Sequence, residues 1–241
     1  MSSSAGPGAD PDLFFFLSFA ESNDTDDKLV STFFGDLRDE VRAVAGTRRG
    51  DPAPTGFLSI ANLRLGADWS AEIRAALGTC RVFVALCSPT YFASESCGKE
   101  WQAFADRITE HQRRTGTKPP ALLPVYWRPV SIPATIDDRQ YTDRSLSEIV
   151  SRVGLLRVMR PAKYQDDYHE FLPALAELIV NTARSHPLTP SSPGPDFSSL
   201  PRAFPDPPAR PSVRPPTSTE HQEPSPPDLD RGNQIPRLHG I

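Results

Sequence analysis

Short apolar runs alternate with longer segments of mixed polarity from Leu13 to about Arg184. The runs are almost wholly apolar, as expected for strands of a parallel sheet that is covered on both faces. They predict five strands, over residues 13–19, 56–60, 80–87, 121–127 and 155–159. Pro124 lies within the fourth run and cannot donate a hydrogen bond to a neighbouring strand, so we expect this strand to be irregular or at an edge.

The segments between these runs carry apolar residues at helical spacing. They predict helices over 29–44, from Asp68 to about Leu77, from Ser88 to about Arg113 with a break near Gly98, over 145–153, and from Tyr168 to about Arg184. Alternating strands and helices of this kind predict an α/β fold. The specific expectation is a flavodoxin-like doubly wound sheet of about five parallel strands in the order 2-1-3-4-5, with helices on both faces.

The distribution of proline divides the chain. Of 27 prolines, more than half follow His186, in a stretch with few aliphatic residues. Such a stretch cannot bury enough apolar surface to offset the entropy lost on ordering. We therefore expect a disordered N-terminus over 1–12, a folded domain over 13–185 and a disordered Pro/Ser-rich tail over 186–241. Truncation after Arg184 should accordingly leave stability unchanged.

Net charge, cysteine content and the first residues indicate which partners and which location to expect. The 26 basic and 30 acidic residues give a formal net charge of -4, which offers no electrostatic reason to expect nucleic acid or an anionic membrane as partner. Three cysteines are too few for a disulfide framework or a structural zinc site and indicate reduced thiols. The apolar run 13–17 is too short to cross a bilayer, and the first residues lack the basic flank of a secretion signal. We expect a soluble, cytoplasmic protein.

Several activities of doubly wound folds are disfavoured by particular residues. A phosphoacceptor receiver domain needs an aspartate at the end of the third strand, where this chain has Cys87-Ser88. The loop over 20–27 is acidic and would repel the phosphate of a flavin, and Gly-rich nucleotide-binding motifs are absent. The five histidines are scattered without metal-ligand spacing, so no metal and no bound cofactor are expected.

Three segments, in order, resemble TIR domains: FFFLSFAESND after residue 13, GADWSAEIRAAL after residue 65, and VFVALCSPTYFASESCGKEW after residue 81. The third contains the Leu-x-Ser-Pro-x-Tyr and Ser-x-x-Cys-x-x-Glu features of the TIR third strand and third helix. The segment GLLRVMRPAKYQDDYHEFLPALAELI is also similar to the actinobacterial FxsC-type TIR-like proteins, which accompany a radical-enzyme peptide-modification system.

The TIR resemblance singles out Glu100, whose counterpart in catalytic members binds the ribose hydroxyls of NAD⁺ while the nicotinamide-ribosyl bond breaks. A carboxylate suits this chemistry because it stabilises an oxocarbenium-like transition state. On a helical wheel Glu100 lies about 70° from the centre of the apolar stripe that contains Cys97 and Trp101. We therefore expect its carboxylate to be partly desolvated but still reachable from solvent.

Other candidate residues follow from their positions in the predicted elements. Ser18 and Phe19, at the carboxyl end of the first strand, are candidates for lining a substrate pocket. Trp69 could stack on a base or pack into the core. Two departures weaken an NAD⁺ site: Ser96 replaces an aromatic residue, and Ala20-Glu21 replaces a basic one.

Two functions remain open. The first is a signalling module that self-associates, or that binds other TIR proteins or proteins of the same peptide-modification system. It would do so through a loop that includes Asn62, Arg64 and Gly66. The second is an NAD⁺ glycohydrolase, with NAD⁺ as substrate and Glu100 as catalytic residue. The enzyme requires Glu100 at the base of an open cleft beside Ser18 and Phe19, whereas a filled cleft favours the module.

Overall fold

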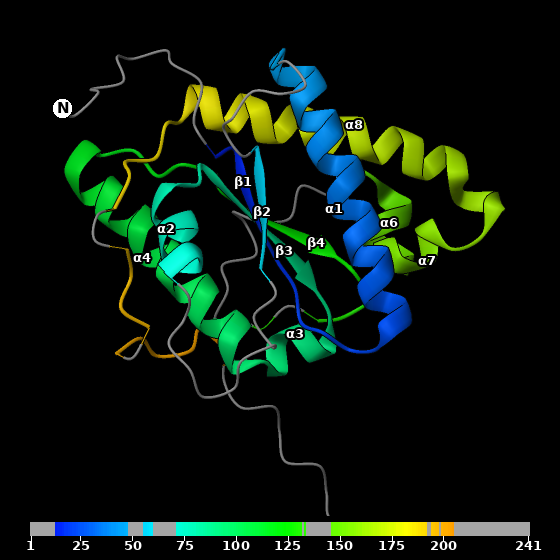
Figure 1. Cartoon of the computed structure of the whole chain (residues 1–241), viewed down its shortest axis with the longest axis horizontal. Helices are drawn as coiled ribbons and strands as arrows, with labels where there is room; N and C mark the ends of the chain where they lie inside the picture. Colours follow the sequence, from blue (N-terminus) through cyan, green and yellow to red (C-terminus); the bar gives the residue numbers. More distant parts are fainter. Residues whose placement is uncertain are drawn as a thin grey trace, which may run out of the picture. The chain divides into compact units, whose positions relative to one another are not determined.

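A four-stranded parallel sheet forms the centre of the domain (Figure 1). The computed structural model describes residues 13–47, 55–59, 71–131, 133, 146–191, 194–197 and 199–204. The strands are β1 (Phe15–Ser18), β2 (Gly56–Leu58), β3 (Val82–Cys87) and β4 (Leu122–Tyr126). Their order is β2-β1-β3-β4, which confirms the α/β class and the predicted order of the first four strands.

One face of the sheet is covered by α1 (Asp24–Ala45), α6 (Glu148–Val153), α7 (Leu155–Met159) and α8 (Gln165–Ser185). Phe15, Leu17 and Val84 point from the strands into this layer. The Asn23 side chain caps α1 by accepting a hydrogen bond from the backbone N–H of Asp26 at 3.0 Å, so the helix begins before the apolar stripe that predicted it.

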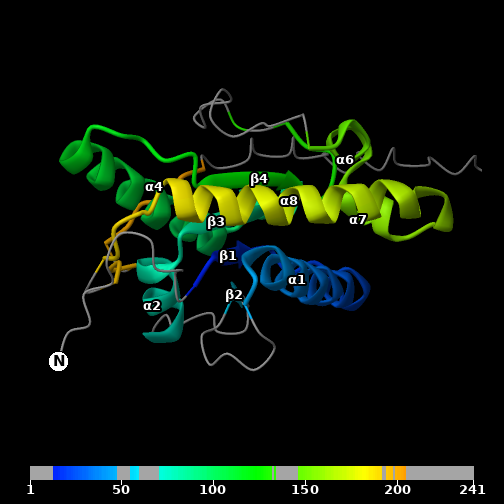
Figure 2. The ribbon, with the colours of Figure 1, turned by 90° about the horizontal axis from the view of Figure 1, so that it is seen from above.

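The opposite face is covered by α2 (Ala71–Thr79), α3 (Pro89–Ala93) and α4 (Glu95–Thr115). Figures 1 and 2 both show α2 and α4 on one side of the strands, and α1, α6 and α7 on the other. Phe16, Phe83 and Cys87 point into this second layer, so residues adjacent along a strand serve different layers. Because helices cover both faces of the sheet, the strands are mostly apolar.

The predicted fifth strand over 155–159 is wrong: these residues form the short helix α7. A strand would bring Leu155, Arg157 and Met159 to one face, whereas Leu155, Leu156 and Val158 are the buried residues and Arg157 is exposed. Gly154 precedes the helix at φ 84°, and the N–H of Leu156 donates to the carbonyl of Trp127 at 3.1 Å. The segment therefore packs as a helical turn against α1 and α8.

The break predicted near Gly98 lies four residues earlier, where α3 and α4 separate at Ser94. The Ser94 hydroxyl accepts a hydrogen bond from the N–H of Cys97 at 3.3 Å and so caps α4. Gly98 lies inside the continuous helix, where an added Cβ would come within 2.9 Å of the Cβ of Arg202. This glycine permits a close approach of the chain instead of ending a helix.

The expected domain boundary at residue 185 is wrong for the stretch that follows α8. Leu188, Phe197 and Phe204 are buried in the layer that contains α2 and α4. These three side chains are spaced too widely to form a recognisable apolar pattern, so their burial depends on the surface that receives them. The remainder of the predicted tail, 205–241, and the predicted N-terminal segment 1–12 lie outside the described residues.

Candidate functional site

Glu100 lies on α4 and is fully buried, with an exposed fraction of 0%. Its two carboxylate oxygens accept hydrogen bonds from different hydroxyls: Oε2 from Ser18 and Oε1 from Ser59. Ser18 ends β1 and Ser59 follows β2, so the carboxylate joins α4 to the carboxyl ends of two adjacent strands. The expected partly exposed carboxylate is instead enclosed, because serine hydroxyls at the ends of the neighbouring strands bond both of its oxygens.

The register of β1 and β2 brings the two serines together. Phe16 pairs with Phe57, and Leu17 pairs with Leu58, so the same tripeptide, Phe-Leu-Ser, ends both strands at equivalent positions. The N–H of Ser59 donates to the carbonyl of Leu17 at 2.9 Å and continues the pairing. Ser59 was not among the predicted site residues, although this repeated tripeptide was a signal in the sequence that could have identified it.

Tyr91 extends the hydrogen-bond network from α3. Its hydroxyl donates to Ser18 Oγ at 3.2 Å, and Ser18 in turn donates to Glu100. The Ser88 side chain fixes the start of α3 by accepting a hydrogen bond from the N–H of Tyr91 at 3.0 Å. Tyr91 belongs to the Leu-x-Ser-Pro-x-Tyr motif but was not predicted as a site residue. We call Ser18, Ser59, Tyr91 and Glu100 the Glu100 cluster.

The electrostatic environment of Glu100 is unusual for a carboxylate. Burial raises its pKa to about 7, and the hydrogen bonds from Ser18 and Ser59 oppose this rise. Within the described ranges no basic side chain forms an ion pair with it. Burial raises the pKa of the nearby Cys97 thiol well above its usual range, so Cys97 is a packed thiol and not an activated nucleophile.

The structure brings together only part of the predicted site. Ser18 and Glu100 are in direct contact. The Phe19 side chain packs into the layer of α1 and α8, and only its backbone carbonyl faces α4, where it accepts a hydrogen bond from Cys97 Sγ at 3.4 Å. The four remaining candidates, Asn62, Arg64, Gly66 and Trp69, lie outside the described residues.

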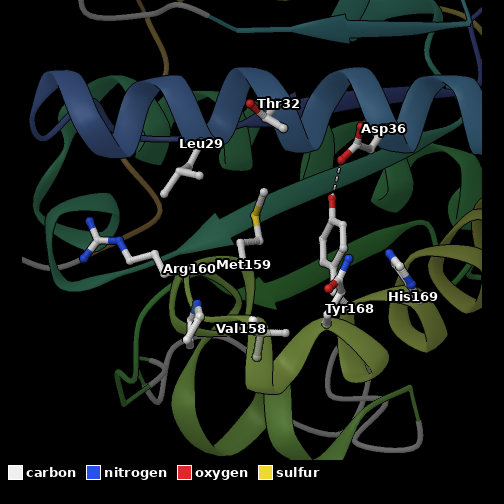
Figure 3. Close-up of a pocket in the computed structure, with 11 residues that line it drawn as sticks. Leu29, Thr32, Asp36, Val158, Met159, Arg160, Tyr168 and His169 are labelled. Atoms are coloured by element: carbon white, nitrogen blue, oxygen red, sulfur yellow. Dashed lines mark hydrogen bonds between the residues drawn. The ribbon is translucent and has the colours of Figure 1, made fainter.

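A hollow of about 370 Å³ lies in the layer of α1 and α8, and Figure 3 shows its walls. Leu29, Thr32 and Asp36 of α1 face Met159 of α7 and Tyr168 of α8 across it. The Tyr168 hydroxyl donates to Asp36 Oδ2 at 2.7 Å. Its lining includes no member of the Glu100 cluster, so it is not the cleft expected beside Ser18.

Two further searches bear on the class of site. Among the residues that the structure describes, no group of three or more His, Cys, Asp or Glu side chains lies together as a metal site would require. No helix in the same ranges is long and apolar enough to span a membrane.

Comparison with known proteins gives one match. The family model described as TIR domain matches residues 15–149, more than half of the 241-residue chain. No curated protein and no solved structure matches the chain. The matched range contains β1 to β4, the predicted assembly loop and Glu100.

Proposed function

Because the chain belongs to the TIR domain family, a family of signalling, interaction and NAD⁺-cleaving domains, we propose that it acts as an interaction module. In this proposal it signals by assembling with a second copy or with other TIR proteins through the loop that includes Asn62, Arg64 and Gly66. The narrower similarity to FxsC-type proteins supports a place in a bacterial peptide-modification or defence system, and this assignment is likewise a proposal.

The enclosed state of Glu100 carries the proposal. A glycohydrolase must present a carboxylate to the ribose of its substrate. The carboxylate oxygens and the ribose hydroxyls must then be able to come within hydrogen-bond distance. Here both carboxylate oxygens are bonded to serines of the chain, and Ser18, Ser59 and Glu100 each have an exposed fraction of 0%. Glu100 therefore acts as a structural link between α4 and the sheet.

Two departures from the TIR pattern in the sequence support the same conclusion. Ser96 stands four residues before Glu100, where an aromatic side chain would contact the dinucleotide. Ala20-Glu21 follows β1 and places negative charge where the resemblance implies a basic residue near phosphate. Both features weaken an NAD⁺ site, since a carboxylate repels a phosphate.

The second candidate function is NAD⁺ cleavage with Glu100 as catalytic residue. One observation favours it: Glu100 and Ser18 meet at the carboxyl end of β1, the edge at which doubly wound sheets bind their ligands. This function requires a state in which the Glu100 cluster opens.

One experiment separates the two functions. Purified full-length protein is incubated at high concentration with NAD⁺, while nicotinamide release and the mass of the assembly are followed by chromatography and light scattering. We expect mass to rise with concentration and nicotinamide release to equal that of Glu100→Gln. Arg64→Ala should reduce assembly, whereas Arg114→Ala, an exposed change on α4, should not. Release that Glu100→Gln abolishes would establish the enzyme instead, and a strict monomer would exclude self-assembly.

A further inference from the structure

The described residues of the segment that follows α8 lie against α2 and α4 and form no helix or strand of their own. Leu188 and Phe204, near its two ends, are buried to exposed fractions of 0% and 2%. At its start, Arg81 Nη1 donates to the carbonyl of Leu188 at 2.6 Å, and Arg107 Nε donates to the carbonyl of Thr189 at 2.9 Å. We call the described residues 188–191, 194–197 and 199–204 the strap.

Two helix glycines allow the backbone of the strap to approach closely. The N–H of Ser191 donates to the carbonyl of Gly78 at 2.9 Å, and the N–H of Ala203 donates to the carbonyl of Gly98 at 3.2 Å. A Cβ on Gly78 would lie 2.7 Å from the carbonyl oxygen of Ser191. A Cβ on Gly98 would lie 2.9 Å from the Cβ of Arg202, an atom that cannot rotate away from its backbone. The surfaces of α2 and α4 are thus shaped to receive this segment.

The far end of the strap contacts the residues that flank Glu100. The Phe204 ring packs against Tyr91 at 5.7 Å and against Trp101 at 5.5 Å between centroids. Tyr91 donates to Ser18, which donates to Glu100, and Trp101 is the next residue after Glu100 in α4. A continuous set of contacts therefore runs from Phe204 to the buried carboxylate.

The strap can leave this surface without breaking the fold. It contributes no strand to the sheet and no turn to a helix. When it leaves, the domain therefore loses the contacts of the strap itself and keeps the hydrogen bonds between its strands. Segments with these properties open at lower free energy than the core. Departure would remove the Phe204 ring from Tyr91, whose hydroxyl donates to Ser18.

We propose that the face formed by α2, α3 and α4 is a binding surface whose resident occupant is the strap, and that vacating this surface opens the Glu100 cluster to solvent. The inference goes beyond assembly through the predicted loop. It concerns access to Glu100 and holds whether the domain assembles, cleaves NAD⁺ or does neither.

A pair of glycine variants of the full chain tests whether the strap packs as described. Alanine in place of a helix glycine ordinarily stabilises a helix. Gly35, inside α1, has no atom within 4 Å of its added Cβ, so Gly35→Ala should raise the melting temperature. Gly98→Ala should lower it, because the methyl group displaces the strap. In a Phe204→Ala background, where the strap is already loosened, Gly98→Ala should lose this destabilising effect.

Access to the Glu100 cluster is measured by labelling Cys97 under native conditions and by amide hydrogen exchange. In Phe204→Ala and Gly98→Ala we expect Cys97 to be labelled at least tenfold faster than in wild type. Amides over 95–101 should exchange faster, while those of α1 and α8, in the opposite layer, should not change. Phe204→Leu keeps an apolar anchor and should show a smaller effect in the same direction.

Three results would overturn the proposal. Equal gains in melting temperature for Gly35→Ala and Gly98→Ala would show that the strap does not pack on α4. Labelling of Cys97 at the wild-type rate in Phe204→Ala would show that the strap packs without controlling access. Faster exchange in every helix would show that the variant unfolds globally. None of these readouts depends on nicotinamide release or on assembly, so failure here is distinguishable from failure of the proposed function.

Discussion

Two carboxylates are buried at opposite faces of the sheet, and their surroundings act on them in opposite directions. Asp26 has an exposed fraction of 1% and pairs with Arg160 at 2.7 Å and with Arg128. Burial alone would raise the pKa of Asp26, but the hydrogen bond and the charge of Arg128 hold it below the usual range. Glu100 has only hydroxyl donors, so burial prevails and its pKa rises to about 7.

This difference predicts a pH dependence of stability that belongs to Glu100. Between the usual glutamate pKa of 4.5 and about 7, the folded chain holds a proton that the unfolded chain has released. The free energy of unfolding contributed by this residue is therefore fully present below pH 4.5 and falls as pH rises, by up to about 3 kcal/mol. Urea unfolding of wild type and Glu100→Gln across pH 4 to 8, with roughly 0.3 kcal/mol precision, measures it.

The difference in free energy of unfolding between wild type and Glu100→Gln reports on Glu100 alone, because all other groups titrate in both proteins. Glu100→Gln should gain stability relative to wild type as pH rises from about 4.5 to 7. Glu110→Gln, an exposed change on the same helix, should not reproduce this gain. A difference that stays constant with pH would mean that Glu100 titrates as an ordinary glutamate.

At the scale of elements, Arg107 joins α4 to α2 and to the strap. Its Nη1 atom donates to the carbonyls of Leu77 and Cys80, at 2.8 and 2.7 Å, where α2 ends. Its Nε atom reaches the carbonyl of Thr189. These carbonyls need donors because they are buried, and the negative end of the α2 dipole favours a cation. One guanidinium thus satisfies backbone carbonyls of two segments and joins both to α4.

Replacement of this residue should be costly. Arg107→Met leaves buried carbonyls without donors and should lower the free energy of unfolding by about 3 kcal/mol, as measured by urea unfolding. Arg107→Lys should recover only part of the stability that Arg107→Met loses, since an ammonium group cannot reproduce the planar set of donors of a guanidinium. The matched control is Arg114→Met, an exposed change on the same helix, which should cost less than about 0.5 kcal/mol. Similar losses for the two methionine variants would contradict this role.

At the scale of the whole molecule, the strap belongs to the folded domain. Truncation after Arg184 would uncover the apolar surface that Leu188, Phe197 and Phe204 cover. We expect a net loss of about 2 kcal/mol, which lowers the melting temperature by about 4 to 8 °C for a domain of this size. Truncation after Pro207 keeps all of these anchors and should change the melting temperature by less than about 1 °C. Scanning calorimetry distinguishes the two, and equal melting temperatures would refute the packing.

The sequence by itself determined the elements whose side chains follow a regular period. The apolar runs of β1 and β3, the Ser88-Pro89 start of α3 and the apolar stripe of α8 each identify an element, because local spacing records which side of a strand or helix is buried. The TIR resemblance singled out Glu100, and the position of Ser18 at the carboxyl end of the first strand predicted that it lies at the same edge of the sheet, where the two residues are in contact.

Only the tertiary structure decided how deeply these residues are buried and what covers them. A helical wheel gives the direction of Glu100 but not the serines of two other elements that enclose it. Five residues at 155–159 suit a strand or a helix equally, and packing on α1 and α8 selects the helix. Phe197 and Phe204 have no periodic partners, so their burial depends on a surface built by α2 and α4 far earlier in the chain. The free energy of burial comes from complementary surfaces, and spacing along a single segment carries no record of them.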